Sequence, residues 1–235
     1  MNKVMGMEVK AVIFDLDGTI INTIEDIADA NNRMLQEFGY PTHNINEYIG
    51  WIGNGARTLV EASLPPQKRN GDTLYYLDKY EQYYRENINN KSKLYPQIDK
   101  LFDFLTDNNI LFAINTNKPQ HLTDIVVDHY LKKWSFTDVI GHRNHFPHKP
   151  DPTGALHFAK QINCDPKYIL FIGDSMVDIQ TALAAGMIPM GVSWGYGQPQ
   201  MQGDDVMLVD RPGEILDYIN ETTMQIQSIK LHTGQ

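Results

Sequence analysis

The feature that most constrains the fold is a repeated alternation of short apolar runs with segments of helical periodicity. The runs are rich in Val, Ile and Phe and too short for helices, which is typical of strands buried on both faces. Strands and helices that alternate in this way build a parallel sheet with helices on both faces, so we predict an α/β fold. The predicted strands are Val9–Phe14, Ile110–Ile114, Val139–Ile140, Tyr168–Ile172, Ile188–Val192 and Val206–Val209. The predicted helices between them are Ile98–Thr106, Pro119–Leu131, Thr153–Gln161 and Met176–Ala185.

One long segment breaks this alternation, because residues 23–88 carry helical patterns and no convincing strand. Two apolar stripes at helical spacing run through it, one over Ile24–Phe38 and one over Leu74–Ile88, and such stripes are typical of a bundle core. We therefore predict an all-helical domain, residues 22–93, inserted into a core domain made of residues 1–21 and 94–235. Two connecting segments between the domains favour a hinge.

Composition and charge narrow the class of partner. A chain of 235 residues with 42% hydrophobic content can bury a core of its own. Its net charge of −9, spread along the sequence, disfavours binding to nucleic acid or to anionic lipid. The single cysteine, Cys164, permits no internal disulfide, and no apolar run is long enough for a signal peptide or a bilayer span. We expect a cytoplasmic monomer or homodimer that acts on small molecules.

Two pairs of acidic residues follow predicted strands. Asp15 and Asp17 follow the first strand, and Gly18 after them permits a sharp backbone turn. Asp174 follows the fourth strand, and Asp178 lies one helical turn later. Ligands of open α/β sheets bind beyond the carboxyl ends of the strands, so these acids should meet there. Ionised acids so close together require a cation, and oxygen ligands favour Mg²⁺. The simpler alternative is that Asp174 caps a helix and Asp178 complements its dipole.

Two further groups suggest phosphate binding. Thr116 and Asn117 follow the second strand, shortly before Pro119 opens a helix, and a hydroxyl with free N–H groups at a helix start can receive phosphate oxygens. Lys149 lies in a loop with three prolines, where a fixed ammonium can neutralise a transferring phosphoryl group. The simpler alternatives are a helix N-cap at Thr116 or Asn117 and a solvated lysine at position 149.

The order of these four groups resembles the haloacid dehalogenase superfamily of phosphohydrolases, whose members carry Asp-x-Asp-Gly-Thr, then Thr or Ser, then Lys, then Gly-Asp with a further Asp. The resemblance implies a Rossmann-like catalytic core with the helical insertion as a mobile cap. It implies an aspartyl-phosphate formed on Asp15, with Asp17 as the proton carrier. It also implies phosphoryl binding by Thr116, Asn117 and Lys149, and a Mg²⁺ site built from Asp15, Asp17, Asp174 and Asp178.

Two glycine-rich segments narrow the substrate. Gly50–Arg57 in the insertion and Val192–Gly197 near the C-terminus resemble phosphoglycolate phosphatases, and also related bacterial phosphatases that split pyrophosphate or small phosphomonoesters. A glycine-rich loop can present N–H groups to a carboxylate, and an arginine can pair with it. We expect a small acidic phosphorylated metabolite, with substrate contacts from Gly53, Asn54, Gly55 and Arg57. The simpler alternative is a plain turn before a helix at Ala56–Ala62, with a solvated arginine.

Other readings of the pattern stay open. A mutase similar to β-phosphoglucomutase would use the same acid pair but return the phosphoryl group to the sugar. A phospho-receiver module also groups acids, a hydroxyl and a lysine, although receivers are shorter and lack the helical insertion. His142, His145 and His148 are spaced by threes, but a proline between the last two and the absence of a partnering cysteine disfavour zinc.

Overall fold

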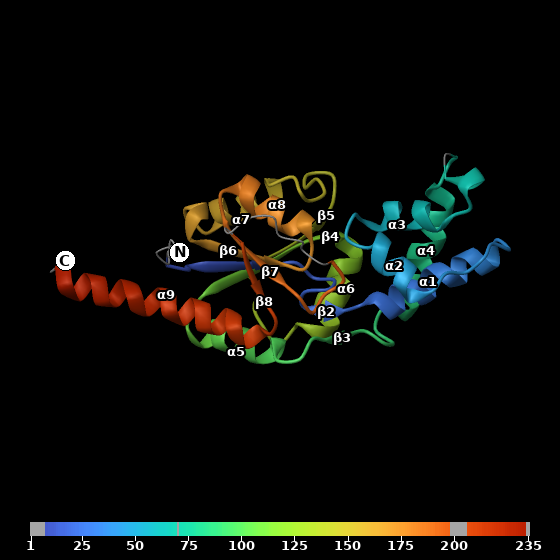
Figure 1. The fold of residues 1–235 in the computed structure, drawn as a ribbon. Helices are drawn as coiled ribbons and strands as arrows, with labels where there is room; N and C mark the ends of the chain where they lie inside the picture. The colour runs from blue at the N-terminus through green and yellow to red at the C-terminus, as the bar shows by residue number, and fades with distance from the viewer. Residues whose placement is uncertain (1–7, 70, 198–205, 234–235) are drawn as a thin grey trace.

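The computed structural model describes the backbone of residues 8–69, 71–197 and 206–233, and the side chains of these ranges up to residue 222. Its centre is a parallel sheet of six strands in the order β5-β4-β1-β6-β7-β8, which confirms the predicted fold class (Figure 1). The strands are β1 (Ala11–Phe14), β4 (Leu111–Pro119), β5 (Asp138–His142), β6 (Ile169–Gly173), β7 (Ile188–Val192) and β8 (Met207–Val209).

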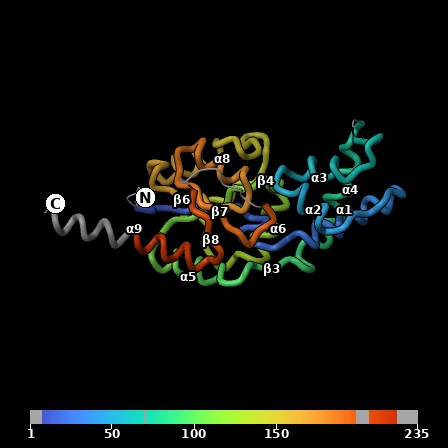
Figure 2. The backbone as a smooth tube through the Cα atoms, in the orientation of Figure 1, coloured from blue at the N-terminus to red at the C-terminus, as the bar shows by residue number. Residues whose placement is uncertain are grey.

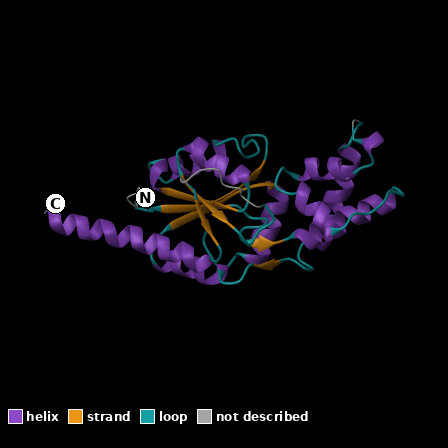
Figure 3. Ribbon diagram, viewed as in Figure 1, coloured by secondary structure: helices purple, strands orange, loops and turns teal. Residues whose placement is uncertain are grey.

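Helices cover both faces of this sheet, as Figure 3 shows. Successive side chains of a strand point to opposite faces, so Ala11 and Ile13 of β1 pack in one cluster and Val12 and Phe14 in another. The first cluster contains side chains from α7 (Thr153–Gln161) and α8 (Met176–Ala185); the second contains side chains from α5 (Ile98–Asp107), α6 (Gln120–Tyr130) and α9 (Pro212–Thr233). A short 3-10 helix, Pro166–Tyr168, precedes β6.

The predicted core elements are confirmed with one instructive exception. The bounds of α7 and α8 match the prediction residue for residue, and Gly186 ends α8 with a left-handed φ of 69°. The exception is β4, which was expected to end at Ile114 and continues to Pro119. Its pairing with β5 shifts register between Asn115 and Pro119. The continuation is polar in sequence yet buried, and the side chains of Asn117 and Lys118 find hydrogen-bond partners in other parts of the chain.

The residues between the first two long core strands form a separate helical unit, hereafter the cap. It contains α1 (Ile24–Glu37), α2 (Ile45–Trp51), α3 (Ala56–Ser63), α4 (Leu74–Asn87) and the 3-10 turn Pro66–Lys68. Helices α1 and α4 pack against each other, and the predicted apolar stripes supply most of their buried side chains. Leu74 was expected in a stripe but is 52% exposed, because it lies at the outer end of α4. None of the described helices combines the length and apolar character needed to cross a membrane.

Two short strands connect the cap to the core. β2 (Ile21–Asn22) pairs antiparallel with β3 (Lys93–Leu94), so the chain enters and leaves the cap at one place (Figure 2). The buried carboxylate of Asp26 in α1 accepts hydrogen bonds from the main-chain N–H groups of Lys91 and Ser92 and from the Ser92 hydroxyl. These bonds fix the returning segment against the first cap helix. The cap therefore lies beyond the carboxyl ends of the sheet strands.

Candidate active site

The candidate site lies beyond the carboxyl ends of the neighbouring strands β4, β1 and β6. Phe14 at the end of β1 pairs with Ile114 of β4 and with Ile172 of β6, so the residues that follow emerge side by side. Asp15 comes directly after Phe14, and its main-chain N–H donates to the carbonyl of Ile172 at 2.9 Å. Residues distant in sequence are thus gathered at the sheet edge where α/β proteins bind ligands.

Three buried carboxylates form the centre of the site. Asp15, Asp174 and Asp178 each offer an oxygen, and these atoms all lie within 4.8 Å of one another. The ammonium of Lys149 lies among them, 2.7 Å from Asp15 Oδ1 and 2.5 Å from Asp178 Oδ1. Lys149 is only 5% exposed, so the alternative of a solvated loop lysine is wrong. Because three carboxylates face one ammonium, the fully ionised cluster carries an excess of negative charge.

Burial changes the proton affinity of these groups. It raises the pKa of Asp15 to about 7; Lys149 lowers this pKa, while the charges of Asp178 and Asp174 raise it. Burial and then the charge of Asp178 raise the pKa of Asp174 to about 6, although main-chain N–H groups of the loop after β7 lower it. Burial by itself lowers the pKa of Lys149, but Asp15 and Asp178 raise it above its usual value. Lys149 is therefore protonated at neutral pH.

The cluster fits a divalent cation. Asp178 uses both of its oxygens, because Oδ1 accepts from the ammonium and Oδ2 accepts from the main-chain N–H and hydroxyl of Ser175. Within the described part of the chain, Asp174 Oδ1 has only a long contact, 3.4 Å, from the hydroxyl of Thr19. Asp15 and Asp174 thus keep acceptor capacity, and oxygen ligands with uncompensated negative charge are the set that Mg²⁺ prefers. Ser175 is the N-cap of α8, so the alternative of Asp174 as that cap is wrong.

Gly18 allows the loop after β1 to approach the acids closely. It adopts a left-handed φ of +89°, and a Cβ atom at this position would lie 2.4 Å from Asp174 Oδ2. A side chain here would therefore displace the carboxylate. The glycine that follows the acid pair is needed both for the turn and for the close contact.

Asp17 is held apart from the other acids by its own partners. Lys118 Nζ donates to both carboxylate oxygens of Asp17 at 2.9 Å, and the Thr23 hydroxyl donates to Oδ1 at 2.7 Å. The side chain of Lys118 is 4% exposed, and its Nζ lies 4.7 Å from the ring centroid of Tyr84 in the cap. Two acids two residues apart therefore have different cationic partners, Asp15 with Lys149 and Asp17 with Lys118.

Asn117 connects the core to the cap. Its side-chain Nδ2 donates to the carbonyl of Gly53 in the cap at 2.8 Å and to the carbonyl of Lys149, while its Oδ1 accepts from the main-chain N–H of Lys149. Thr116 accepts a hydrogen bond from the main-chain N–H of Lys118 at 3.3 Å. Since β4 runs to Pro119 and Pro119 is the N-cap of α6, the alternative of Thr116 or Asn117 as that N-cap is wrong.

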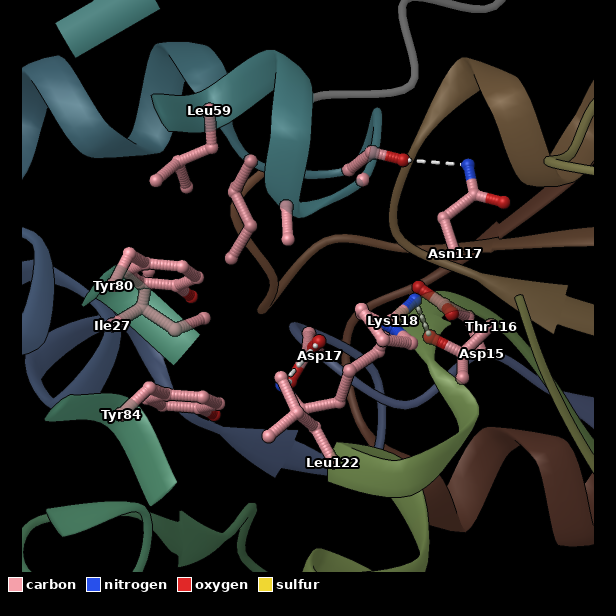
Figure 4. A pocket seen from close by; sticks show the side chains of 15 residues that line it. Asp15, Asp17, Ile27, Leu59, Tyr80, Tyr84, Thr116, Asn117, Lys118 and Leu122 are labelled. Atoms are coloured by element: carbon pink, nitrogen blue, oxygen red, sulfur yellow. Dashed lines mark hydrogen bonds and ion pairs between the residues drawn. The ribbon is translucent and has the colours of Figure 1, made fainter. Parts of the chain in front are cut away.

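A cavity separates the acids of the core from the cap (Figure 4). Its core side is polar, and its cap side is apolar and aromatic. The residues that line it are Asp15, Asp17, Ile27, Ile52, Gly53, Gly55, Ala56, Leu59, Tyr80, Tyr84, Thr116, Asn117, Lys118, Pro119 and Leu122.

The structure divides the four expected cap residues into two pairs. Gly53 and Gly55 line the cavity with left-handed φ values of 102° and 88°. Asn54 is exposed and does not line it. Arg57 is also exposed, and its Nε donates to Glu61 at 2.8 Å on the outer side of α3. The cap loop therefore presents backbone, rather than these two polar side chains, to the acids.

The three histidines do not form a metal site among the described residues. The rings of His142 and His148 stack with centroids 3.5 Å apart, and His145 is exposed. The pKa of His148 is lowered mainly by burial and to a smaller extent by the charge of the neighbouring His142. His148 lies against Gly55, where a Cβ atom would come within 2.6 Å of its Nε2. This contact places the pair behind the cap loop rather than in the cavity.

Three residues without a predicted role belong to this site, although one of them, Tyr196, lies within the glycine-rich segment Val192–Gly197. Lys118 pairs with Asp17, Tyr84 supports Lys118, and Tyr196 joins the acids to the start of the cap. The main-chain N–H of Tyr196 donates to Asp174, and its hydroxyl accepts from the main-chain N–H of Thr23. A lysine next to the expected phosphate loop was a usable signal for Lys118, whereas the tyrosines lie in apolar or glycine-rich contexts.

Comparison with known proteins agrees with this geometry. Residues 12–192 match the family model of the haloacid dehalogenase-like hydrolases. Phosphoglycolate phosphatase of Haemophilus influenzae is 32% identical over 204 residues, covering 82% of this chain and 89% of its own. Phosphoglycolate phosphatase of Psychrobacter arcticus is 31% identical over 222 residues, covering 91% and 96%.

A solved structure gives the same result. A protein of Haemophilus somnus, described as a predicted phosphoglycolate phosphatase, superimposes with a TM-score of 0.80 at 29% identity, covering 89% of this chain and 97% of that one. The family match spans both the strands that carry the acids and the inserted cap. The chain therefore belongs to the haloacid dehalogenase-like hydrolases, and it is a phosphatase of that family.

Proposed function

We propose that this phosphatase hydrolyses a small acidic phosphomonoester, such as phosphoglycolate, with Mg²⁺ and through an aspartyl-phosphate. The observation that carries the proposal is the separation of two acids in one site. Asp15 is paired with Lys149 inside the buried cluster, and Asp17 is held by Lys118 at its edge. Nucleophilic attack and proton transfer need two groups, and acids with separate partners can divide these roles.

In the first step, a carboxylate oxygen of Asp15 attacks phosphorus as the ester oxygen leaves. Asp17 donates a proton to that leaving oxygen, which becomes the alcohol of the product. In the second step, Asp17 removes a proton from water, and this water attacks the phosphorus of the aspartyl-phosphate. Inorganic phosphate leaves, and Asp15 and Asp17 return to their starting forms.

The remaining polar residues bind the phosphoryl group. The Thr116 hydroxyl, the Lys149 ammonium and the main-chain N–H of Asn117 would contact its oxygens. Asp15, Asp174 and the main-chain carbonyl of Asp17 would hold Mg²⁺, with Asp178 acting through water because its oxygens accept other hydrogen bonds. When bound, Mg²⁺ supplies positive charge that offsets both the acids and the phosphoryl oxygens.

Two observations support a small substrate with a carboxylate. The cavity has a volume of ≈ 50 Å³, and at about 10–15 Å³ for each water this is room for roughly four waters. Two-carbon leaving groups fit such a space. Gly53 and Gly55 border it, and main-chain N–H groups of this loop can approach a carboxylate. We do not include Asn54 and Arg57 among the substrate contacts, because both lie outside the cavity lining.

Replacement of the proposed nucleophile tests the mechanism. We expect Asp15→Asn to abolish hydrolysis of phosphoglycolate in the presence of Mg²⁺, since an amide oxygen does not form the intermediate. Asp107→Asn is the matched control, because Asp107 is exposed at the end of α5. Retention of wild-type activity by Asp15→Asn would exclude Asp15 as the nucleophile.

A second variant tests the intermediate itself. Asp17→Asn removes both the proton donor of the first step and the base of the second, so this variant is given acetyl phosphate, whose acetate leaves without a proton. Only hydrolysis of the intermediate is then blocked, and we expect the phosphorylated enzyme to accumulate and to be detected on Asp15 by mass spectrometry after acid quenching. A hexose phosphate incubated with the wild-type enzyme separates hydrolysis from a mutase reaction, since a hydrolase releases inorganic phosphate and a mutase produces an isomer.

A further inference from the structure

Tyr84 carries a buried hydroxyl without a hydrogen-bond partner among the described residues. The side chain lies on α4 of the cap, is 0% exposed, and its oxygen accepts and donates no hydrogen bond there. A buried hydroxyl left unpaired costs free energy, and such groups in folded proteins are usually satisfied by protein, water or ligand. Burial also raises the pKa of Tyr84 well above its usual value, so the hydroxyl keeps its proton and is a donor.

This hydroxyl is directed toward the active site. Tyr84 lines the cavity between cap and core, and Figure 4 shows its ring extending from α4 with the oxygen toward the side of Lys118 and Asp17. The ring stacks on Tyr80, with centroids 5.7 Å apart and planes at 8°, which fixes its direction. Ile27 and Leu122 also line this part of the cavity, and neither side chain can accept a hydrogen bond.

The charge next to Tyr84 indicates which kind of group it would meet. Among the described residues that line the cavity, Lys118 carries the only positive charge. Its Nζ lies 4.7 Å from the Tyr84 ring centroid and donates to both carboxylate oxygens of Asp17. Lys149 belongs to the acid cluster, and Arg57 faces Glu61 outside the cavity. Since Asp17 already accepts from Lys118, the Tyr84 hydroxyl is a donor left for a ligand, and an acceptor oxygen such as that of a carboxylate would complete it.

We propose that Tyr84 is a specificity-determining residue whose hydroxyl donates a hydrogen bond to the carboxylate of the leaving group, beside the ammonium of Lys118. The proposal rests on the proposed function and adds the residue that recognises the acidic end of the substrate. The phosphoryl group would lie at Asp15 and the carboxylate on the cap side, so the substrate spans the cavity. Tyr84 therefore selects substrates without taking part in phosphoryl transfer.

A matched pair of substrates isolates this contact. Phosphoglycolate and ethyl phosphate share the two-carbon chain and the phosphate, but ethyl phosphate has a methyl group in place of the carboxylate. We measure kcat/KM for both with wild type and Tyr84→Phe, which removes only the hydroxyl. A lost hydrogen bond to a charged group lowers kcat/KM for phosphoglycolate by about tenfold or more, mainly through KM, and leaves ethyl phosphate within about twofold.

Tyr83→Phe is the matched control. It makes the same change one residue earlier on α4, where the hydroxyl donates to Glu37 away from the cavity. We expect it to leave the ratio of the two kcat/KM values unchanged. Thermal unfolding of both variants shows that the comparison is made between folded enzymes.

The outcomes separate the two proposals. A high wild-type preference for phosphoglycolate that Tyr84→Phe reduces supports the role of Tyr84. An equally high preference for phosphoglycolate in Tyr84→Phe overturns that role and leaves the proposed substrate class intact. This result is expected if a buried water satisfies the hydroxyl. Equal wild-type kcat/KM values for the two esters overturn the acidic substrate and, with it, the carboxylate contact of Tyr84.

Discussion

The core wall and the cap wall of the cavity differ in chemistry. On the core side, each acid meets a cation or hydrogen-bond donors, as in the pairs Asp15 with Lys149 and Asp17 with Lys118. On the cap side, apolar and aromatic side chains dominate, and Tyr84 presents a hydroxyl without a partner among the described residues. We propose that this contrast reflects two tasks of the enzyme: the core supplies the charges that phosphoryl transfer needs, and the cap supplies the shape and the few polar groups that select a leaving group.

The largest expected effect is on the core wall, at Lys149. Lys149→Met leaves three buried carboxylates without their ammonium, and we expect activity to fall by at least about a thousandfold. Breaking a buried ion pair on one side also destabilises the fold by about 3–5 kcal/mol. Steady-state kinetics and denaturant unfolding measure the two effects. Lys133→Met is the control, since Lys133 pairs with Asp103 at the exposed surface.

Excess Mg²⁺ distinguishes the two effects of this variant. Added Mg²⁺ supplies positive charge to the acids and should restore part of the lost stability of Lys149→Met. It should not restore activity, because the contact to the phosphoryl oxygens is still missing. If Lys149→Met kept the wild-type kcat, the proposed contact between the Lys149 ammonium and the phosphoryl oxygens would be wrong.

The next effect concerns Lys118, which lies on the core wall and contacts Tyr84 of the cap wall. Lys118→Met keeps much of the side-chain volume but removes the donor to Asp17 and the charge beside Tyr84. We expect kcat to fall by about 10 to 100-fold for phosphoglycolate and also for ethyl phosphate, because Asp17 loses its positioning partner for every substrate. Kinetics with both esters measure this. A loss of kcat confined to phosphoglycolate would mean that Lys118 contacts the carboxylate of the substrate and does not position Asp17.

A smaller effect is the pH dependence of stabilisation by Mg²⁺. The raised pKa values of Asp15, about 7, and Asp174, about 6, mean that both acids bind protons in the metal-free fold at pH values where an unfolded chain has lost them. As pH rises toward these two pKa values, Asp15 and Asp174 lose their protons, and the metal-free fold loses the stability that proton binding gave it. Mg²⁺ then competes with fewer protons for the two carboxylates. We therefore expect the Tm increase caused by Mg²⁺ to be larger at pH 8 than at pH 5.5.

Thermal unfolding with Mg²⁺ and with chelator at both pH values measures this difference. Asp174→Asn should reduce the Mg²⁺ effect at pH 8, and Asp107→Asn should leave it unchanged. An equal Tm increase at both pH values would show that Mg²⁺ does not compete with protons on these acids, and a full Mg²⁺ effect in Asp174→Asn would show that Asp174 does not hold the metal.

The two walls also differ in how far the sequence predicts them. The core strands and the positions of the acids follow from local patterns, since a strand buried on both faces is a continuous apolar run. The extension of β4 through Asn115–Lys118 does not, because its burial depends on segments far away in sequence, which supply the hydrogen-bond partners of Asn117 and Lys118. Lys118 meets Asp17 across 101 positions, and periodicity carries no information about such a pair.

The cap wall shows the same limit in another form. The spacing of Tyr80 and Tyr84 predicts correctly that both are buried on one helix face. It does not predict that the hydroxyl of Tyr84 faces the cavity without a partner among the described residues, since this depends on how the cap lies over the core. Arg57 shows a limit of another kind, because its residue type and loop suit a substrate contact while its side chain pairs with Glu61 outside the cavity lining, so the contact stays a prediction.

The smallest expected effect is at Arg57 and sharpens the boundary of the cap wall. Its side chain is 59% exposed and pairs with Glu61 one helical turn away, so removing it takes no charge from the cavity. We expect Arg57→Ala to change kcat/KM for phosphoglycolate by less than about twofold, because exposed pairs of this kind contribute little. The contrast with Tyr84→Phe is informative, since both changes are in the cap and only one removes a cavity group. A tenfold rise in KM for Arg57→Ala, with ethyl phosphate unaffected, would mean that the arginine swings inward to bind the carboxylate, and the cap wall would then be assembled only after substrate enters.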